Sequence, residues 1–140
     1  MIPKRQIDGS NQIMGRLASS VAKDLMAGYR IEIVNCENIR ISGNYAKQLE
    51  KTFIKFERGP KGNPEKGPHY SRMPDRFVKS MIRTMLPNRN RRGILAFKQL
   101  RCHIGVPKAL EGQTFETGGN KVRHQTFTVG QLCTGLGAHF

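Results

Sequence analysis

The chain has 140 residues, with 24 Lys and Arg against 10 Asp and Glu, a formal net charge of +14 and a hydrophobic share of 37%. This length and composition predict a single domain over residues 1–140 with a modest core. We expect part of the chain to become ordered only against a partner. The sequence has no run of about 18 apolar residues and no apolar signal core behind Met1, so we expect a soluble, intracellular protein without a membrane partner.

Most of the charge lies in the middle of the chain. Residues from Lys51 to Lys108 include fifteen Lys and Arg but only three acids, a formal excess of +12, whereas residues 1–50 carry +2 and residues 111–140 carry none. Such a field attracts phosphate backbones and releases their condensed counterions. The charge therefore predicts a nucleic-acid partner and binding that weakens steeply with salt, but it does not say which nucleic acid.

The first fifty residues predict a strand, a helix and a second strand. A short strand at Gln6–Gly9 precedes a helix from Met14 to Ala27, which Gly28 ends, and β-branched residues predict a strand from Arg30 to Cys36. Residues Ile39–Ile41 either extend this strand or follow it. Parallel pairing with a right-handed crossover is the default for this order, so we expect an α/β fold with a small, mainly parallel sheet.

Two further helices and a long loop are predicted next. Ser42 or Asn44 can cap a helix that ends near Gly59-Pro60, and a Gly- and Pro-rich basic loop follows over residues 58–72. Pro74 suits the first turn of a helix that Pro87 stops. Apolar residues at helical spacing predict the apolar faces of these helices: Tyr45, Leu49, Phe53 and Phe56 in the first, and Phe77, Met81 and Met85 in the second. For the second set we favour packing in the core over a role in ligand binding.

The remaining elements are short. A second basic loop at Asn88–Gly93 leads into a helical run through Leu95 and Phe97, and then into a strand from Arg101 to Ile104. Residues 113–120 form a polar stretch, and we expect a final short helix within Thr126–Leu136.

Basic and stacking side chains are the candidate nucleic-acid contacts. In the first loop the bare Gly and Pro backbone lets cations approach a folded polyanion, while His69 and Tyr70 can stack on an unpaired base. In the second loop, Arg side chains offer planar forks for bidentate phosphate contacts. The candidates are Arg58, Lys61, Lys66, His69, Tyr70, Arg72, Arg76, Lys79, Arg83, Asn88, Arg89, Arg91, Arg92 and Lys98. Two alternatives to nucleic-acid contact remain. The first loop could be a flexible surface loop with solvated charges, and Arg89–Arg92 could be a localisation signal.

Arg16 is a further candidate, because it lies where backbone amides at the start of a helix can meet a phosphate. A solvated Arg in the first helical turn explains it equally well. The spacing of nearby glycines matches neither a dinucleotide fingerprint nor a P-loop, so we predict no nucleotide cofactor.

No motif in the sequence predicts catalysis or metal binding. The ten acids are dispersed, no Gly-x-Ser-x-Gly elbow occurs, and the four His and three Cys lack ligand spacing. We therefore expect no catalytic residue, metal, cofactor or small-molecule substrate, and we interpret Cys36, Cys102 and Cys133 as reduced, mostly packed thiols. An RNA-processing enzyme and a free regulatory RNA binder remain as alternative functions.

Several motifs together resemble the ribosomal protein L13 family in its archaeal and eukaryotic cytosolic form. The amino-terminal half contributes Ile7-Asp8-Gly9, Gly15-Arg16-Leu17-Ala18-Ser19, Asn38-Ile39 and Ile41-Ser42-Gly43-Asn44. The second half contributes Lys66-Gly67-Pro68-His69-Tyr70, Met85-Leu86-Pro87, Arg91-Arg92-Gly93, Leu100 and Gly105-Val106-Pro107. Residues 127–137 also resemble a family segment near the carboxyl end.

The resemblance implies a central, mainly parallel sheet flanked by helices and a structural, noncatalytic role in the large ribosomal subunit. It implies large-subunit rRNA and neighbouring ribosomal proteins as partners, a cytoplasmic location, and nucleolar assembly in a eukaryote. The basic residues of the matched motifs are then the expected RNA contacts. Two positions depart from the family pattern: Thr84 replaces a small residue, and Cys102-His103 replaces an aliphatic-aromatic pair, which affects the expected strand packing.

Overall fold

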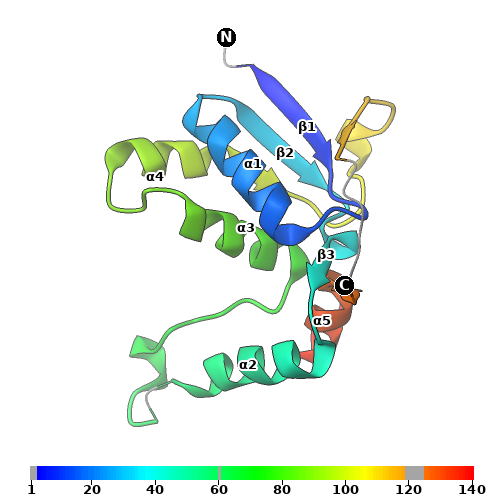
Figure 1. Ribbon diagram of the computed structural model, residues 1–140. Coiled ribbons are helices and arrows are strands. Elements are labelled where there is room, and N and C mark those ends of the chain that lie inside the picture. The colour runs from blue at the N-terminus through cyan, green and yellow to red at the C-terminus, as the bar shows by residue number, and fades with distance from the viewer. Residues whose placement is uncertain (1–2, 60, 119–124) are drawn as a thin grey trace.

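The computed structural model describes residues 3–59, 61–118 and 125–140 and has the predicted α/β architecture (Figure 1). Its main sheet has the strand order β4-β2-β1-β5, and every pairing in it is parallel. A second sheet pairs β3 with β6 in antiparallel orientation. In chain order, the helices and strands are β1 (Lys4–Asp8), α1 (Met14–Met26), β2 (Arg30–Val34), β3 (Arg40–Ser42), α2 (Tyr45–Glu57), α3 (Pro74–Met85), α4 (Arg91–Lys98), β4 (Leu100–Cys102), β5 (Glu116–Thr117), β6 (Thr126–Thr128) and α5 (Val129–Gly135).

The β1–α1–β2 unit confirms the predicted strand, helix and parallel strand. Lys4 pairs with Arg30 and Asp8 with Val34, so both strands run in register over their full length. Gly28 adopts φ +98° directly after the helix, a left-handed conformation that a residue without a Cβ takes at little cost. This turn sends the chain back along α1 into β2.

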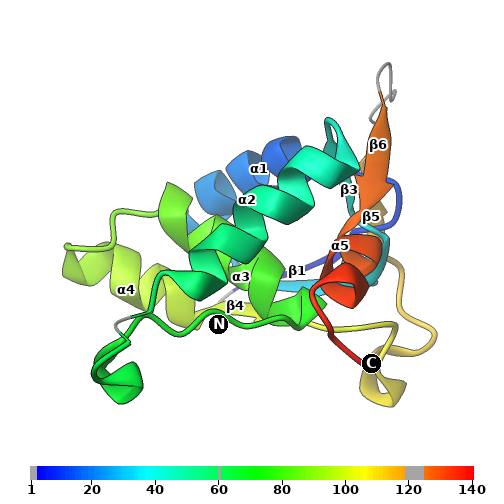
Figure 2. The same cartoon turned by 90° about the horizontal axis from the view of Figure 1, so that it is seen from below.

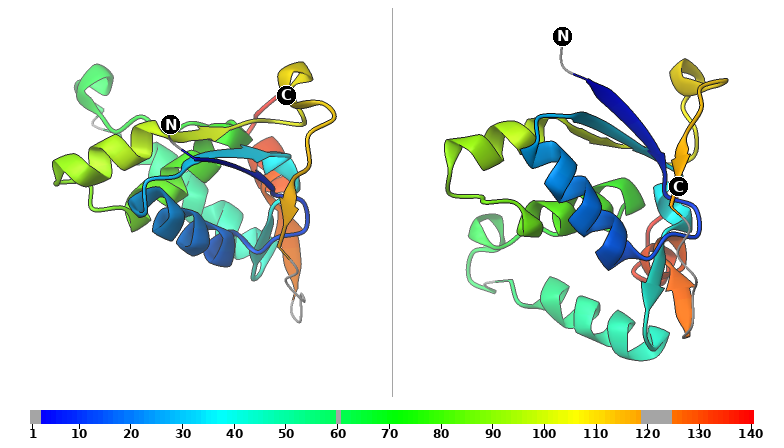
Figure 3. Two further views of the ribbon diagram at one scale, coloured as in Figure 1. Left: turned by 90° about the horizontal axis from the view of Figure 1, so that it is seen from above. Right: turned by 45° about the horizontal axis from the view of Figure 1, so that its top comes forward.

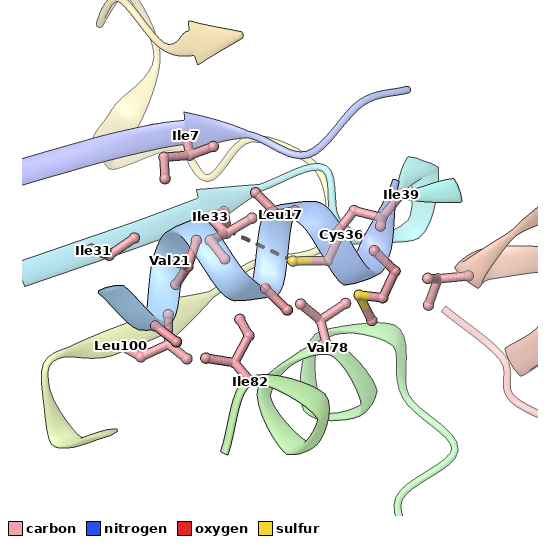
Figure 4. Close-up of a cluster of buried hydrophobic side chains, with 14 of the residues drawn as sticks. Ile7, Leu17, Val21, Ile31, Ile33, Cys36, Ile39, Val78, Ile82 and Leu100 are labelled. Atoms are coloured by element: carbon pink, nitrogen blue, oxygen red, sulfur yellow. Dashed lines mark hydrogen bonds between the residues drawn. The ribbon is translucent and has the colours of Figure 1, made fainter. Parts of the chain in front are cut away.

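The core lies between the main sheet and the helices α1 and α3 (Figure 4). Ile31 and Ile33 of β2 meet Val21 of α1, and Val78 and Ile82 of α3 pack against the same cluster. All five side chains are fully buried. Burying a side chain of this kind contributes roughly 1.5–3 kcal/mol, so this contact fixes α1 and α3 on the sheet. Figure 3 shows α1 and α3 on the same face of the sheet.

The apolar face predicted for the α3 helix is wrong by one position in the helical repeat. Val78 and Ile82 are buried, whereas Met81 and Met85 are 38% and 42% exposed and Phe77 is half-buried. Both sets repeat every four residues, and periodicity alone does not decide which one faces the sheet. The packing of α3 against α1 and β4 decides that Val78 and Ile82 face inward.

The helix α2 is confirmed, but its predicted apolar face is only partly buried. Asn44 is its cap, since its side chain accepts hydrogen bonds from the backbone N–H groups of Ala46 and Lys47. Leu49 and Phe56 pack against a small cluster formed by Phe127, Leu132 and Leu136, whereas Tyr45 and Phe53 are 38% and 51% exposed. The prediction of Tyr45 and Phe53 as core residues is therefore wrong.

The carboxyl-terminal region differs from the predicted single helix in Thr126–Leu136. Residues Thr126–Thr128 form β6, which pairs with β3, and the helix begins only at Val129. Thr128 accepts a hydrogen bond from the Gln131 backbone N–H, and the Gln131 side chain accepts one from the Thr128 N–H, a capping box that stops the strand and starts the helix. The chain after β2 does not extend that strand, because Arg40–Ser42 form β3 of the second sheet.

The short strands β4 and β5 complete the main sheet. Cys102 pairs with Ile33, and the His103 N–H donates to the Ile33 carbonyl at 2.9 Å, so the unusual Cys102-His103 pair leaves the strand packing intact. The strand β5 was not predicted. It is held by Arg5, which donates to Glu116 and to Asp24, and the Glu116 hydrogen bond raises the pKa of Arg5. Residues 119–120 of the predicted polar stretch, Pro60 and His124 lie outside the described residues.

The three cysteines are free thiols, as predicted. Cys36 and Cys133 are buried and Cys102 is half-buried. Contact with Cys102 and burial raise the pKa of the Cys36 thiol, and burial, with the Asp75 carboxylate, raises the pKa of Cys133 to about 11. In the described segments, no three His, Cys, Asp or Glu side chains gather as a metal site. No described helix has the length and apolar character needed to cross a bilayer.

Substitution of Gly93 by Ala should destabilise the protein, because Gly93 packs against the backbone of Pro87. A Cβ at Gly93 would lie 2.8 Å from the Pro87 carbonyl carbon. We expect Gly93→Ala to lower the free energy of unfolding by about 1–3 kcal/mol, measured by urea denaturation. Gly15→Ala is the matched control, because Gly15 also lies in a first helical turn but has nothing within 4 Å of its Cβ position. A wild-type midpoint for Gly93→Ala would contradict the packing.

Candidate nucleic-acid interface

The middle of the chain presents its cations from three neighbouring segments. The first comprises the end of α2 and the loop at residues 61–73, the second is the outer side of α3, and the third runs from Pro87 through α4. Figure 2 shows α2 in front of α1 and α3, with the loop leading back from its end to α3. Most of the predicted contacts lie on these segments with exposed side chains: Arg58, Lys61, Lys66, His69, Tyr70, Arg72, Arg76, Arg83, Asn88, Arg89, Arg91, Arg92 and Lys98.

The basic loop predicted at residues 58–72 is confirmed: the described residues 58–59 and 61–73 lie between α2 and α3, and Tyr70 anchors the loop to α2. Tyr70 packs edge-on against Phe56, with ring centroids 5.8 Å apart. The Arg72 guanidinium lies 5.4 Å from the centre of the same Phe56 ring. A turn at Pro64–Lys66, in which His69 contacts the Glu65 carbonyl, gives the loop its only regular structure among the described residues. Phe56 therefore holds the loop and one of its cations in a defined position.

Cations on α3 are held over an aromatic ring of α4. The Lys79 ammonium lies 5.2 Å and the Arg83 guanidinium 5.7 Å from the centre of the Phe97 ring. Lys79 is half-buried by this contact, whereas Arg76 and Arg83 are exposed. Cation–π contacts of this kind contribute roughly 0.5–1 kcal/mol at exposed sites and keep long side chains in place without neutralising them.

The start of α4 differs from the predicted basic loop. The loop covers only the residues before Arg91, and Arg91 and Arg92 lie in the first helical turn. Asn90 occupies the N-cap position, but its side chain caps no backbone N–H. Two Arg side chains therefore lie at the positive end of the helix dipole. Their repulsion by the dipole destabilises the isolated helix, whereas an anion bound at this end would be stabilised by both.

Arg92 has a structural contact that the other arginines of this segment lack. Its Nη2 atom donates a hydrogen bond of 3.0 Å to the Met26 carbonyl at the end of α1. This carbonyl lies at the negative end of the α1 dipole, so the contact is favourable in charge as well as in geometry.

Arg16 lies apart from these three segments, in the first turn of α1. This helix begins at Met14, its N-cap residue Ile13 provides no side-chain cap, and its first turn contains no acid. Arg16 does line a hollow that also contains Arg5, Asp24 and Glu116, and Arg5 forms ion pairs with both carboxylates, so the hollow offers a phosphate no cluster of free cations. The structure thus leaves Arg16 as an isolated candidate.

No acid of the described chain neutralises the middle segment. The ion pairs found among the described residues are Lys4–Glu32, Arg5–Asp24 and Arg5–Glu116, all outside residues 51–108. The cations from Lys51 to Lys108 therefore form no ion pair with any described residue, although they outnumber the acids of the same segment fifteen to three. The positive charge of these cations is therefore available to an anionic partner that binds from the solvent.

A cavity of about 440 Å³ between α2 and α3 belongs to the same region and was not predicted. Lys55 is a cation on its wall that the candidate set omitted. The signal was present in the sequence, because Gln48 and Thr52 on α2, and Ser80 and Thr84 on α3, each recur at a spacing of four residues beside an apolar stripe. What the sequence does not show is that the two helices face each other.

The fold and this surface define a compact α/β scaffold that carries an unneutralised cationic face. Comparison with known proteins gives the family: the model of "Ribosomal protein L13" matches residues 4–109, so the chain belongs to the ribosomal protein L13 family. This family is not one of enzymes.

The chain is similar to proteins named "Large ribosomal subunit protein uL13". It is 44% identical to that of Archaeoglobus fulgidus over 110 residues, which cover 79% of this chain and 69% of the relative. It is 39% identical to that of Methanosphaera stadtmanae, with 96% and 97% of the two chains covered. It is 37% identical to that of Methanococcus maripaludis, with 96% and 98% covered.

Removal of the Arg92 contact should destabilise the isolated protein. We expect Arg92→Gln to lower the free energy of unfolding by about 0.5–1.5 kcal/mol more than Arg91→Gln, because only Arg92 bonds to Met26. Both variants lose one charge from the same helical turn, so the difference between them isolates the hydrogen bond. Urea denaturation without RNA measures it, and equal midpoints would show that the contact contributes nothing.

Proposed function

We propose that this protein is a structural constituent of the large ribosomal subunit that binds and stabilises large-subunit rRNA through its basic, loop-rich surface at residues 51–108. One observation carries the proposal: fifteen cations share this segment with three acids, and none forms an ion pair with a described residue. Membership of the ribosomal protein L13 family makes rRNA the polyanion that fits.

Binding proceeds by charge neutralisation combined with fit to the shape of folded RNA. Arg72, Lys79 and Arg83 are held over aromatic rings, so little side-chain freedom is lost when they meet phosphates. The uncapped start of α4 adds backbone N–H donors beside Arg91 and Arg92. Double-stranded RNA is recognised largely through phosphate, 2′-hydroxyl and shape contacts, which this surface can make without reading a base sequence.

Neighbouring large-subunit proteins are the remaining partners in this proposal, and the cytoplasm is its location. The exposed apolar side chains on α4, Ile94 and Leu95, are 49% and 50% exposed and suit contact with another macromolecule. No observation favours the alternative of an RNA-processing enzyme over this role.

Loss of two cations should weaken rRNA binding and flatten its salt dependence. We expect the double variant Arg89→Gln and Arg91→Gln to reduce the slope of log K against log salt by about 1.4–1.8, since each lost phosphate contact changes it by about 0.7 on a single strand and about 0.9 on a duplex. Arg92 is left unchanged because it also bonds to Met26. Filter binding to large-subunit rRNA over a range of KCl concentrations measures the slope.

The matched control is the double variant Lys23→Gln and Lys47→Gln, which removes the same charge from two exposed positions outside residues 51–108. We expect its slope to stay close to that of the wild type. If both double variants reduce the slope equally, the charge acts only in bulk and the α4 segment has no special role.

Sedimentation of the native protein in a sucrose gradient tests the ribosomal role itself. We expect it to migrate with large subunits at physiological salt. A purely light fraction would instead support a free RNA binder.

A further inference from the structure

The cavity between α2 and α3 has the size and lining of a small-ligand site. Its volume is about 440 Å³, within the range of roughly 300–1000 Å³ typical of such sites. We infer that it receives one unpaired base of the bound RNA, turned out of its helix or loop. This inference rests on the proposed function and extends it, because a phosphate-binding surface by itself needs no such cavity.

The inner walls of the cavity are apolar and aromatic. Met14 of α1 is 4% exposed and supplies the innermost surface, with Phe77 of α3 beside it. Phe56 and Tyr70 form the other wall, and their edge-on contact keeps both rings in place. Unpaired bases bind proteins chiefly by stacking on such rings, and stacking is tolerant of base identity.

Hydrogen-bonding groups also line the cavity, and two of them are unused in the described chain. Thr52 and Thr84 donate to backbone carbonyls of their own helices, at 2.8 and 2.7 Å. The Gln48 amide and the Ser80 hydroxyl make no side-chain hydrogen bond to another described residue. An amide and a hydroxyl are suited to the donor and acceptor edges of a base, and an apolar ligand would leave both unpaired.

The charge of the lining favours a nucleotide over a peptide. The lining contains Lys55, Arg76 and His69 but no Asp or Glu. Lys55 and Arg76 lie on α2 and α3, on opposite walls, so that phosphates on either side of an inserted base could each meet a cation. An apolar peptide from a neighbouring protein would use the rings but not these two charges.

A substitution that fills the cavity without changing charge tests the inference. Ser80 is exposed and lines the cavity from α3, so Ser80→Trp places a large ring in the space expected for the base. We expect its affinity for Methanosphaera stadtmanae large-subunit rRNA to fall by about tenfold at every salt concentration, since one stacked base contributes on that order. The salt slope should stay unchanged. Ser80→Ala keeps the space open and removes at most one hydrogen bond to the base, so its affinity should fall clearly less than that of Ser80→Trp.

A second pair of variants guards against misfolding of Ser80→Trp, which circular dichroism would reveal. Tyr70 is 50% exposed, so Tyr70→Ala removes a wall without opening the core, and Tyr70→Phe keeps the ring. Weaker binding by Tyr70→Ala but not by Tyr70→Phe, with an unchanged salt slope, supports the inference, because release of the basic loop would flatten the slope. Wild-type affinity of both Ser80→Trp and Tyr70→Ala overturns it, while a wild-type protein without salt-dependent rRNA binding overturns the proposed function as well.

A cryo-EM reconstruction of the wild-type protein in its large subunit gives a direct view. Density for a base between Phe56, Tyr70 and Phe77 supports the inference. Density for a peptide of another ribosomal protein, or a cavity that holds only solvent, overturns it and leaves the proposed function untouched.

Discussion

The packing of Val78 and Ile82 against α1 and the parallel sheet determines where the cations of the middle segment point. Because this stripe of α3 faces inward, Arg76 and Arg83 remain on the outer side of the same helix. The helix α4 follows after a short turn, so Phe97 lies beneath Lys79 and Arg83. The contact between five apolar side chains in the core thus determines the position of the charged surface. A change in that contact would shift the cations of α3 and α4 as a group.

The same arrangement opposes folding in the absence of a partner. Like charges on adjacent segments repel, and the described acids that form ion pairs are used elsewhere, by Lys4 and Arg5. Aromatic rings hold several of the cations in place but do not cancel their charge. Salt or a polyanion lowers this repulsion, so the stability of the free protein and its affinity for a polyanion draw on the same electrostatic energy.

The sequence was sufficient for the fold class and for most of the helices, because these depend on local signals. Gly28, Asn44 and Pro74 mark boundaries through backbone conformation and capping, and the structure confirms each of them. It was not sufficient for the buried faces of α2 and α3, where two stripes had the same spacing and only tertiary contact decides between them. The regular spacing of the polar residues that line the cavity could be seen in the sequence. The fact that α2 and α3 face each other across the cavity could not be predicted from it. The strand β5 escaped prediction because two residues carry no periodicity.

Both sheets join parts of the chain that are synthesised far apart in time. Ile7 of β1 pairs with Glu116 of β5, and Arg40 of β3 pairs with Thr128 of β6. Contacts between distant residues form late, because the intervening chain must first lose its conformational freedom. A nascent chain consequently displays its whole arginine- and lysine-rich stretch before either edge of the fold can close. Emerging from one ribosome, it can meet nucleic acid before it has finished folding.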